Sequence, residues 1–188
     1  MKPRLYFLIT AALLLLGRDC GIAQELHEHS ASGEHTFPAH MIGLDIGHAH
    51  LFERDEEGKK GILSLPSFGI NYTLQINEHW GLGLHTDLIF EEYKILNEVQ
   101  GQEHEEIERI YPIAPALLGI FKFNEHWSVL AGVGREFAKG ENFWLNRAGV
   151  EYGVSLPARW ELFGTLQYDV KWDAYDNWVF AFGLAKHL

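Results

Sequence analysis

Histidine is the residue type whose spacing in this chain most directly suggests chemistry. His48 and His50 stand two positions apart in a segment of alternating polarity, so on a β-strand both side chains lie on one face. Two neutral imidazoles on one face can share a metal ion such as zinc or nickel, with zinc–nitrogen distances of about 2.0 to 2.1 Å. The plainer interpretation is two neutral histidines at a polar boundary. We favour that interpretation and keep zinc or nickel as the alternative cofactor.

A second group of histidines precedes this strand among acidic residues: His27, His29, His35 and His40, with Glu25, Glu28 and Glu34. Such a polar stretch has few large apolar groups to bury, so residues 24–40 are predicted to form a flexible periplasmic lead-in. Histidine-rich tails bind metal weakly when no preorganised site exists.

A His-x-Ser arrangement occurs once, at His126-Trp127-Ser128. It is similar to the pairing of some outer-membrane lipid A deacylases, in which His acts as the base for a Ser nucleophile. The same turn sequence recurs at His79-Trp80-Gly81, where Gly replaces Ser. The His-Trp pair is therefore interpreted as a turn feature, and we predict no catalytic residue and no enzyme.

Charged and polar residues fall on one face of the alternating segments, and they mix both signs. These are Asp45, His85, Asp87, Glu91, Lys122, Glu136, Arg147, Glu151, Glu161, Asp169 and Lys171. An eight-stranded barrel has an interior just wide enough for packed side chains, so these residues are predicted to form an ion-paired interior charge network. Within it, Arg147 and Lys171 are expected to pair with neighbouring carboxylates such as Glu151, Glu161 and Asp169.

The elements that would position these residues are segments in which apolar residues recur at every second place. Eight such segments are predicted, at 41–52, 62–76, 80–95, 107–123, 127–138, 143–156, 160–172 and 178–188. Tight connections alternate with longer, more charged ones, as in antiparallel membrane barrels with short periplasmic turns and longer outer loops. Segment 107–123 is the weakest, since Pro112 and Pro115 would each remove a ladder hydrogen bond and could mark a bulge near the outer rim.

Tryptophan marks both ends of the predicted strands. Trp80, Trp127 and Trp160 each follow a tight turn, and Trp172 and Trp178 lie at the opposite ends of their strands. The indole ring is apolar and its N–H bonds water, so these five residues are predicted to form girdles at the two membrane interfaces.

The chain resembles the small bacterial outer-membrane barrels of the outer membrane protein A and X type. The resemblance implies an all-β fold, an eight-stranded antiparallel up-and-down transmembrane β-barrel over residues 41–188. The last strand places Phe180, Phe182, Leu184 and Leu188 at alternate positions, a pattern that assembly machinery recognises, although Lys186 and the terminal Leu188 depart from it. The alternatives are a soluble β-sandwich and a lipocalin-type barrel, whose apolar faces point inward.

Residues 1–23 are predicted to be a cleaved signal peptide. Lys2 and Arg4 precede an apolar run at 5–16, which is too short to be a retained membrane helix, and Gly21-Ile22-Ala23 suits cleavage before Gln24. Cys20 invites a lipoprotein interpretation, but the residues before it lack the small and apolar character of a lipid-attachment sequence.

Cleavage would remove three cations, one anion and the single Cys, so the formal net charge would move from −11 to −13. An acidic chain without a basic patch is not expected to bind nucleic acid. The predicted partners are outer-membrane lipid and the outer-membrane assembly machinery, with the protein as a monomer. Two functions are open: a structural or interaction barrel with a plugged polar interior, or a narrow transport or metal-handling component.

Overall fold

The computed structural model describes residues 37–54, 60–97, 105–172 and 174–188. The predicted signal peptide and most of the predicted lead-in lie outside these residues. The strands are β1 (Ala39–Arg54), β2 (Lys60–Gln75), β3 (Trp80–Ile89), β4 (Glu92–Asn97), β5 (Glu105–Ile110), β6 (Ile113–Lys122), β7 (Trp127–Glu136), β8 (Phe143–Leu156), β9 (Trp160–Lys171) and β10 (Asp176–His187), with a 3₁₀ turn, η1, at Pro157–Arg159. No helix within the described ranges is long and apolar enough to cross a membrane.

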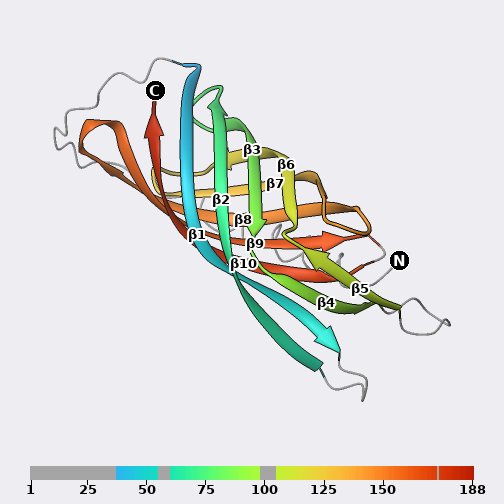
Figure 1. Cartoon of the computed structure of the whole chain (residues 1–188). Coiled ribbons are helices and arrows are strands. Elements are labelled where there is room, and N and C mark those ends of the chain that lie inside the picture. Colours follow the sequence, from blue (N-terminus) through green and yellow to red (C-terminus); the bar gives the residue numbers. More distant parts are fainter. Residues whose placement is uncertain (1–36, 55–59, 98–104, 173) are drawn as a thin grey trace. The chain divides into compact units, whose positions relative to one another are not determined.

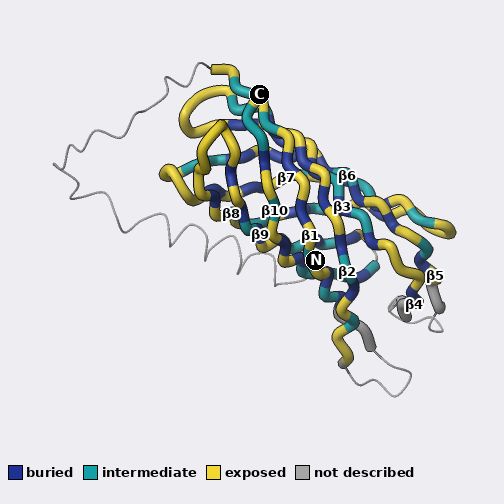
Figure 2. Tube along the Cα trace, turned by 60° about the vertical axis from the view of Figure 1, so that its left-hand side comes forward, coloured by how far each residue is buried: buried dark blue, intermediate teal, exposed yellow. Residues whose placement is uncertain are grey.

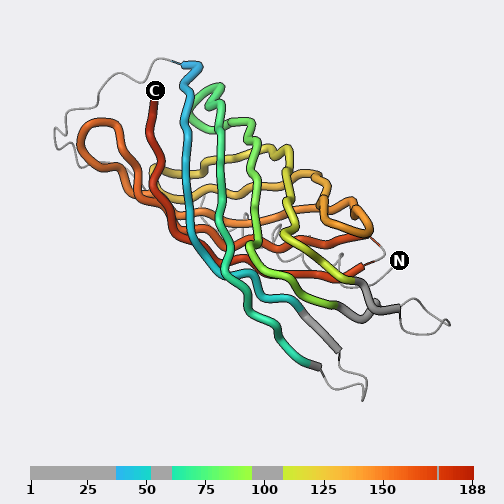
Figure 3. Tube along the Cα trace, in the orientation of Figure 1, coloured from blue at the N-terminus to red at the C-terminus, as the bar shows by residue number. Residues whose placement is uncertain are grey.

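Eight strands form one closed antiparallel barrel in the order β1-β10-β9-β8-β7-β6-β3-β2 (Figure 1). The closing seam joins β1 to β10, where Leu44 lies opposite Leu184, and β1 pairs on its other side with β2. Figure 3 shows the blue β1 running beside the red β10, so the two ends of the described chain close the sheet. The predicted eight-stranded up-and-down barrel is confirmed, and β1 begins two residues before the predicted boundary.

Two of the predicted strands are each divided into a barrel strand and an outer extension. Segment 80–95 breaks after Ile89 and segment 107–123 breaks at Tyr111-Pro112, so β4 and β5 form a separate two-stranded hairpin. Tyr111 adopts a left-handed backbone conformation (φ 46°), and Pro112 has no N–H to continue the ladder. Pro115 stays within β6, opposite Thr86. The proline disruption therefore lies at the outer rim, at Pro112 alone.

The two faces of the barrel differ sharply in burial (Figure 2). Outward side chains are large and apolar, with Leu44 and Leu117 each 61% exposed, whereas the inward Asp45 and Arg147 are 5% and 1% exposed. A lipocalin-type barrel would show the reverse arrangement. A continuous apolar outer surface is stable in lipid, so this face spans the membrane and the polar face lines the lumen.

The repeated Asn-Glu-His-Trp sequence builds the same turn twice. The Asn77 side-chain oxygen accepts hydrogen bonds from the backbone N–H groups of His79 and Trp80, both at 2.9 Å. Asn124 does the same for His126 at 2.9 Å and Trp127 at 2.8 Å. An Asn side chain that bonds the backbone two residues ahead stabilises a tight turn. The repetition thus has a local structural cause.

The predicted girdle residues lie on the outer surface. Trp80, Trp127, Trp160 and Trp172 are exposed, and Trp178 is half-buried against Tyr168, with 4.5 Å between ring centroids. The first three begin β3, β7 and β9 at the end with the short turns.

Candidate functional site

The centre of the lumen is organised by Arg147, on β8. Its Nε and Nη2 donate to the two carboxylate oxygens of Asp169, each at 2.8 Å. Nη2 also lies 2.5 Å from Asp87 Oδ2, in an ion pair whose geometry is not that of a hydrogen bond. The Arg147 side chain is fully buried. Paired bonds from one guanidinium to one carboxylate fix the orientation of both groups.

These contacts cross the lumen. Asp169 stands directly opposite Arg147 on the neighbouring strand β9, whereas Asp87 comes from β3, four strands from β9 around the barrel. In an eight-stranded ring, strands four apart lie on opposite walls. Arg147 therefore bridges the two walls and blocks the middle of the lumen.

Asp45 and His85 flank this central group. The Asn71 amide donates to Asp45 Oδ2 at 2.7 Å, and His85 Nε2 lies 3.4 Å from the Thr73 hydroxyl. Gly69 is opposite Asp45, and a Cβ at Gly69 would collide with the Asp45 carboxylate. Glycine at this position therefore leaves the space that the Asp45 carboxylate occupies, and a larger residue would require the carboxylate to move.

A second cluster fills the lumen nearer the longer connections and centres on Glu136 of β7. Arg109 of β5 donates to Glu136, and Lys171 Nζ lies 3.2 Å from the second carboxylate oxygen. The Tyr175 hydroxyl donates to the same carboxylate at 2.8 and 3.1 Å, and Lys171 Nζ lies 4.1 Å from the Tyr175 ring centroid. Three groups from different parts of the chain, Arg109, Lys171 and Tyr175, thus converge on one carboxylate.

Tyr175 precedes β10 and lies beyond the membrane-spanning strands. Burial raises the pKa of its hydroxyl well above the usual 10.0, and the Glu136 carboxylate raises that pKa further. Tyr175 therefore stays protonated and acts as a hydrogen-bond donor. Its oxygen also lies 2.8 Å from the Tyr93 hydroxyl on β4. This contact joins the outer hairpin to the barrel mouth.

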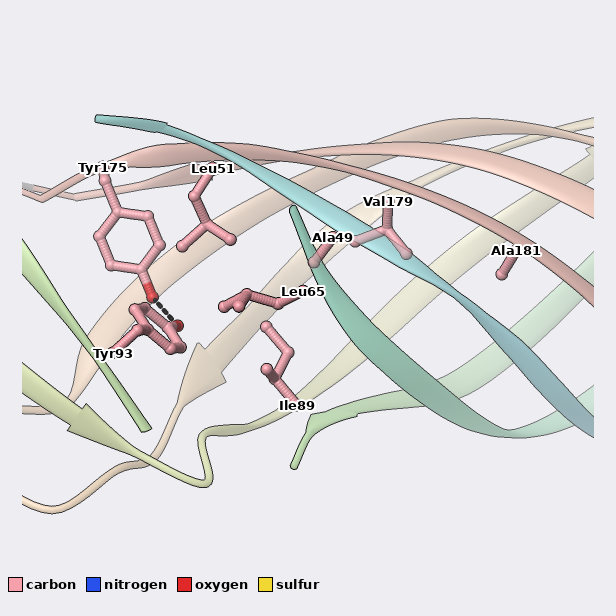
Figure 4. Close-up of a cluster of buried hydrophobic side chains, with 8 residues drawn as sticks. All are labelled: Ala49, Leu51, Leu65, Ile89, Tyr93, Tyr175, Val179 and Ala181. Atoms are coloured by element: carbon pink, nitrogen blue, oxygen red, sulfur yellow. Dashed lines mark hydrogen bonds between the residues drawn. The ribbon is translucent and has the colours of Figure 1, made fainter. Parts of the chain in front are cut away.

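The two tyrosines lie at one end of a cluster of buried side chains (Figure 4). The cluster consists of Ala49, Leu51, Leu65, Ile89, Tyr93, Tyr175, Val179 and Ala181 (Figure 4). It draws on β1, β2, β3, β4 and β10, so the outer part of the lumen is filled by apolar packing as well as by charge.

The space between the central and outer charged groups is small. The residues that line a cavity of about 10 Å³ include Asp87 and Asp169 of the central group and Glu136 and Lys171 of the outer group. That volume is about the size of one water molecule. The two groups of charges are therefore nearly in contact.

A third charged group lies toward the short turns. His187 Nε2 is 3.3 Å from Glu161 Oε2. Lys122 on β6 and Glu151 on β8 are half-buried, and each stands opposite Ser128 on the strand between them, β7. Neither Glu151 nor Glu161 contacts Arg147, whose partners are Asp169 and Asp87. The expected pairing of Arg147 with Asp169 is present, whereas Lys171 pairs with Glu136.

Glu91 is the one predicted interior residue that the structure places outside. It is exposed at the break between β3 and β4, where its carbonyl accepts from Tyr111 N at 3.4 Å. The alternation that predicts an inward side chain requires an unbroken strand, and β3 ends at Ile89. The prediction for Glu91 is therefore wrong.

Four contributors to the interior were missed from the sequence: Arg109, Tyr93, Tyr175 and Asn177, whose side-chain oxygen accepts from Lys171. Arg109 lies in Glu105–Ile110, where charged residues occupy both faces, and Tyr175 lies in a connection. Neither position carries an alternation signal. The inward direction of Asn177, between Asp176 and Trp178, follows the period of its strand, and so does that of Tyr93, between exposed Glu92 and Lys94.

His48 and His50 both project from the outer face of β1. Their ring centroids are 6.4 Å apart with nearly parallel planes, and His48 Nδ1 lies 3.4 Å from the Ser64 hydroxyl. Among the residues that the structure describes, no group of three or more His, Cys, Asp or Glu side chains could hold a metal ion. The pair therefore offers two metal ligands, and a complete site would need another from elsewhere.

His126 is engaged in the turn. Its Nδ1 donates to the Gly153 carbonyl at 3.0 Å, just as His79 Nδ1 donates to the Lys122 carbonyl at 3.0 Å. Ser128 is buried on the lumen face, while His126 is exposed. In both copies of the repeat the His side chain therefore hydrogen-bonds the turn to a neighbouring strand. This supports the interpretation of the His-Trp pair as a turn feature.

No protein-family profile matches the chain, and no curated protein sequence matches it. Solved structures do. The attachment invasion locus protein Ail of Yersinia pestis, in complex with the heparin analogue sucrose octasulfate, shares 17% identity over 79% of this chain and 99% of its own, with a TM-score of 0.50. Outer membrane protein AlkL in DMPC bilayers shares 12% identity over 88% and 97%, with a TM-score of 0.48, and Neisserial surface protein A shares 14% over 78% and 96%, with a TM-score of 0.43.

At these identities the likeness to Ail is one of fold. It agrees with the closed eight-stranded sheet and with the apolar outer face. This chain therefore has the fold of the small eight-stranded outer-membrane barrels that its sequence resembles.

Proposed function

We propose that this protein is a bacterial outer-membrane barrel that acts through its surface, in a structural or interaction role, and that its lumen carries no flux. The observation that carries the proposal is the ion pairing of Arg147 with Asp169 and Asp87 on opposite walls of the lumen. The cluster around Glu136 adds a second closure toward the outer mouth.

Energetics favour a permanently closed lumen. Opening a water path at the centre would separate Arg147 from its partners, and breaking a buried ion pair so that a charge is left unpaired costs about 3 to 5 kcal/mol. The outer cluster would have to open as well. An unaided open state would therefore be populated at well under about one per cent.

The parts available for interaction are the strand extensions beyond the closed barrel. The β4–β5 hairpin continues past the barrel rim, and β1 and β2 remain paired from Leu51 and Leu63 up to Arg54 and Lys60. They lie at the end with the longer connections, which in outer-membrane barrels faces the outside. Export by the predicted signal peptide at 1–23 is part of this proposal.

Planar-bilayer recording of the purified mature protein tests the sealed lumen. We expect no steady single-channel current from the wild type. The matched variant Arg147→Gly removes the central bridge and should show brief or steady openings if it folds. Steady ohmic currents from the wild type would overturn the proposal and favour a narrow transport role.

The stacked pair His48 and His50 supports metal handling as a second candidate function. Its test is calorimetric titration of zinc and nickel into the wild type and into His48→Ala/His50→Ala. Micromolar binding that the double substitution abolishes would favour metal handling. Binding no tighter than millimolar, or binding that survives the substitution, would remove it.

A further inference from the structure

Arg135 lies on the outer face of β7 and is held between two aromatic rings. It stands directly opposite Trp144 on β8, and Phe137 follows it on the same face of its own chain. The guanidinium carbon lies 5.4 Å from the centroid of each ring. Cation–π contact with two rings restricts the positions that the guanidinium can adopt.

The guanidinium has no anionic partner among the residues that the structure describes. The Nε atom is buried without a hydrogen-bond partner, and within the described part of the chain the side chain contacts the Phe137 and Trp144 rings. Arg109 and Arg147 each pair with a buried carboxylate.

The clamp sits at the outer edge of the lipid-facing surface. Trp144 and Phe137 are 52% and 44% exposed, and Val133, two residues earlier on the same face, is 53% exposed. Residues 137–142 connect β7 to β8 at this end, the one opposite Trp80, Trp127 and Trp160. Apolar surface therefore lies below the guanidinium, and the water boundary lies above it.

We infer that Arg135, clamped by Phe137 and Trp144, binds a phosphate group on a lipid headgroup at the outer membrane boundary. The planar guanidinium matches two phosphate oxygens, and the clamp removes much of the entropy cost of orienting it. Exposed Val133 and the rings supply apolar contact for the attached acyl chains, which free phosphate would not use. The inference rests on the proposed outer-membrane location.

Native mass spectrometry of the folded mature protein in detergent can measure this binding. The probes are a diphosphorylated disaccharide lipid, the same lipid without phosphates, and inorganic phosphate as competitor. The variants are Arg135→Gln and a matched control, Arg159→Gln, which removes an exposed guanidinium from the turn at the opposite end. We expect Arg135→Gln to weaken binding of the diphosphorylated lipid by about fivefold, the effect of about 1 kcal/mol per basic residue at a membrane surface.

Arg159→Gln should bind this lipid as the wild type does, and the dephosphorylated lipid should bind all three proteins equally. Equal binding by Arg135→Gln and wild type, or an equal loss in both variants, would overturn the inference. Displacement of the lipid by micromolar inorganic phosphate would show a free-anion site and overturn the lipid assignment. A wild type that is soluble without detergent would instead overturn the proposed function.

Discussion

Replacing Arg147 by Met should destabilise the barrel far more than replacing an arginine whose side chain points outward from the barrel. The Arg147 side chain is 0% exposed, and its partners Asp87 and Asp169 have side chains 8% and 3% exposed. Met keeps most of the volume but leaves two carboxylates buried without a cation. Removing one partner of such a buried pair costs about 3 to 5 kcal/mol. The measurement is the free energy of unfolding from urea titration in lipid vesicles, for protein whose compact form is seen on unboiled gels.

Arg135→Met is the matched control, because Arg135 is also on a barrel strand but contacts only two rings. This substitution should lower the free energy of unfolding by about 0.5 to 1 kcal/mol, the range for an exposed cation–π contact. The triple variant Arg147→Met/Asp87→Asn/Asp169→Asn removes the stranded charges and should recover most of the loss. A folded Arg147→Met protein within about 1 kcal/mol of wild type, or a triple variant no more stable than the single one, would refute the reasoning.

Three further outcomes are expected in the same unfolding assay. Tyr175→Phe deletes the hydrogen bonds to Glu136 and Tyr93 and should cost about 1.5 to 3 kcal/mol, whereas Tyr111→Phe, at an exposed ring, should be neutral. Leu84→Arg should cost about 2 to 4 kcal/mol if Leu84 lies near the membrane midplane, and Leu156→Arg, near the turn end, about 0 to 1; equal costs would contradict the membrane span. Asn124→Ala removes two turn hydrogen bonds and should cost about 1 kcal/mol, and no change on this substitution would contradict the structural role of the repeated turn.

The barrel could be predicted because the alternation is unbroken in most strands. In β9, inward Glu161, Thr165 and Asp169 alternate with outward apolar residues such as Leu162 and Leu166, and the burial of this strand follows that pattern. A strand with one polar and one apolar face specifies which residues share a side.

The alternation failed where both faces carry the same residue type or the strand stops. In β6, inward Ala116 and Leu118 alternate with outward Leu117, so the sequence does not show that apolar residues also fill the lumen. Beyond Ile89 the closed sheet ends, and the predicted inward direction of Glu91 had no basis there.

Pairing across the barrel could not be predicted either. Arg147 meets Asp87 because β3 and β9 lie on opposite walls, and that proximity depends on closure and stagger, which the sequence pattern does not specify. Neighbouring-strand pairing, as between Arg147 and Asp169, needs only register, and this pair was among those expected from the sequence.

A nitroxide scan along β9 tests the sealed membrane barrel most directly. Cys20 is the only cysteine, and the predicted cleavage removes it, so single cysteines can be placed at Leu162, Thr165, Leu166 and Gln167 of the mature protein and spin-labelled in lipid vesicles. Labels at Leu162 and Leu166 should be accessible to oxygen but not to a water-soluble nickel complex, and labels at Thr165 and Gln167 should be inaccessible to both. Access of the nickel complex to the inward sites would indicate an open, water-filled lumen. Access of the nickel complex to the outward sites would contradict the membrane-spanning face itself.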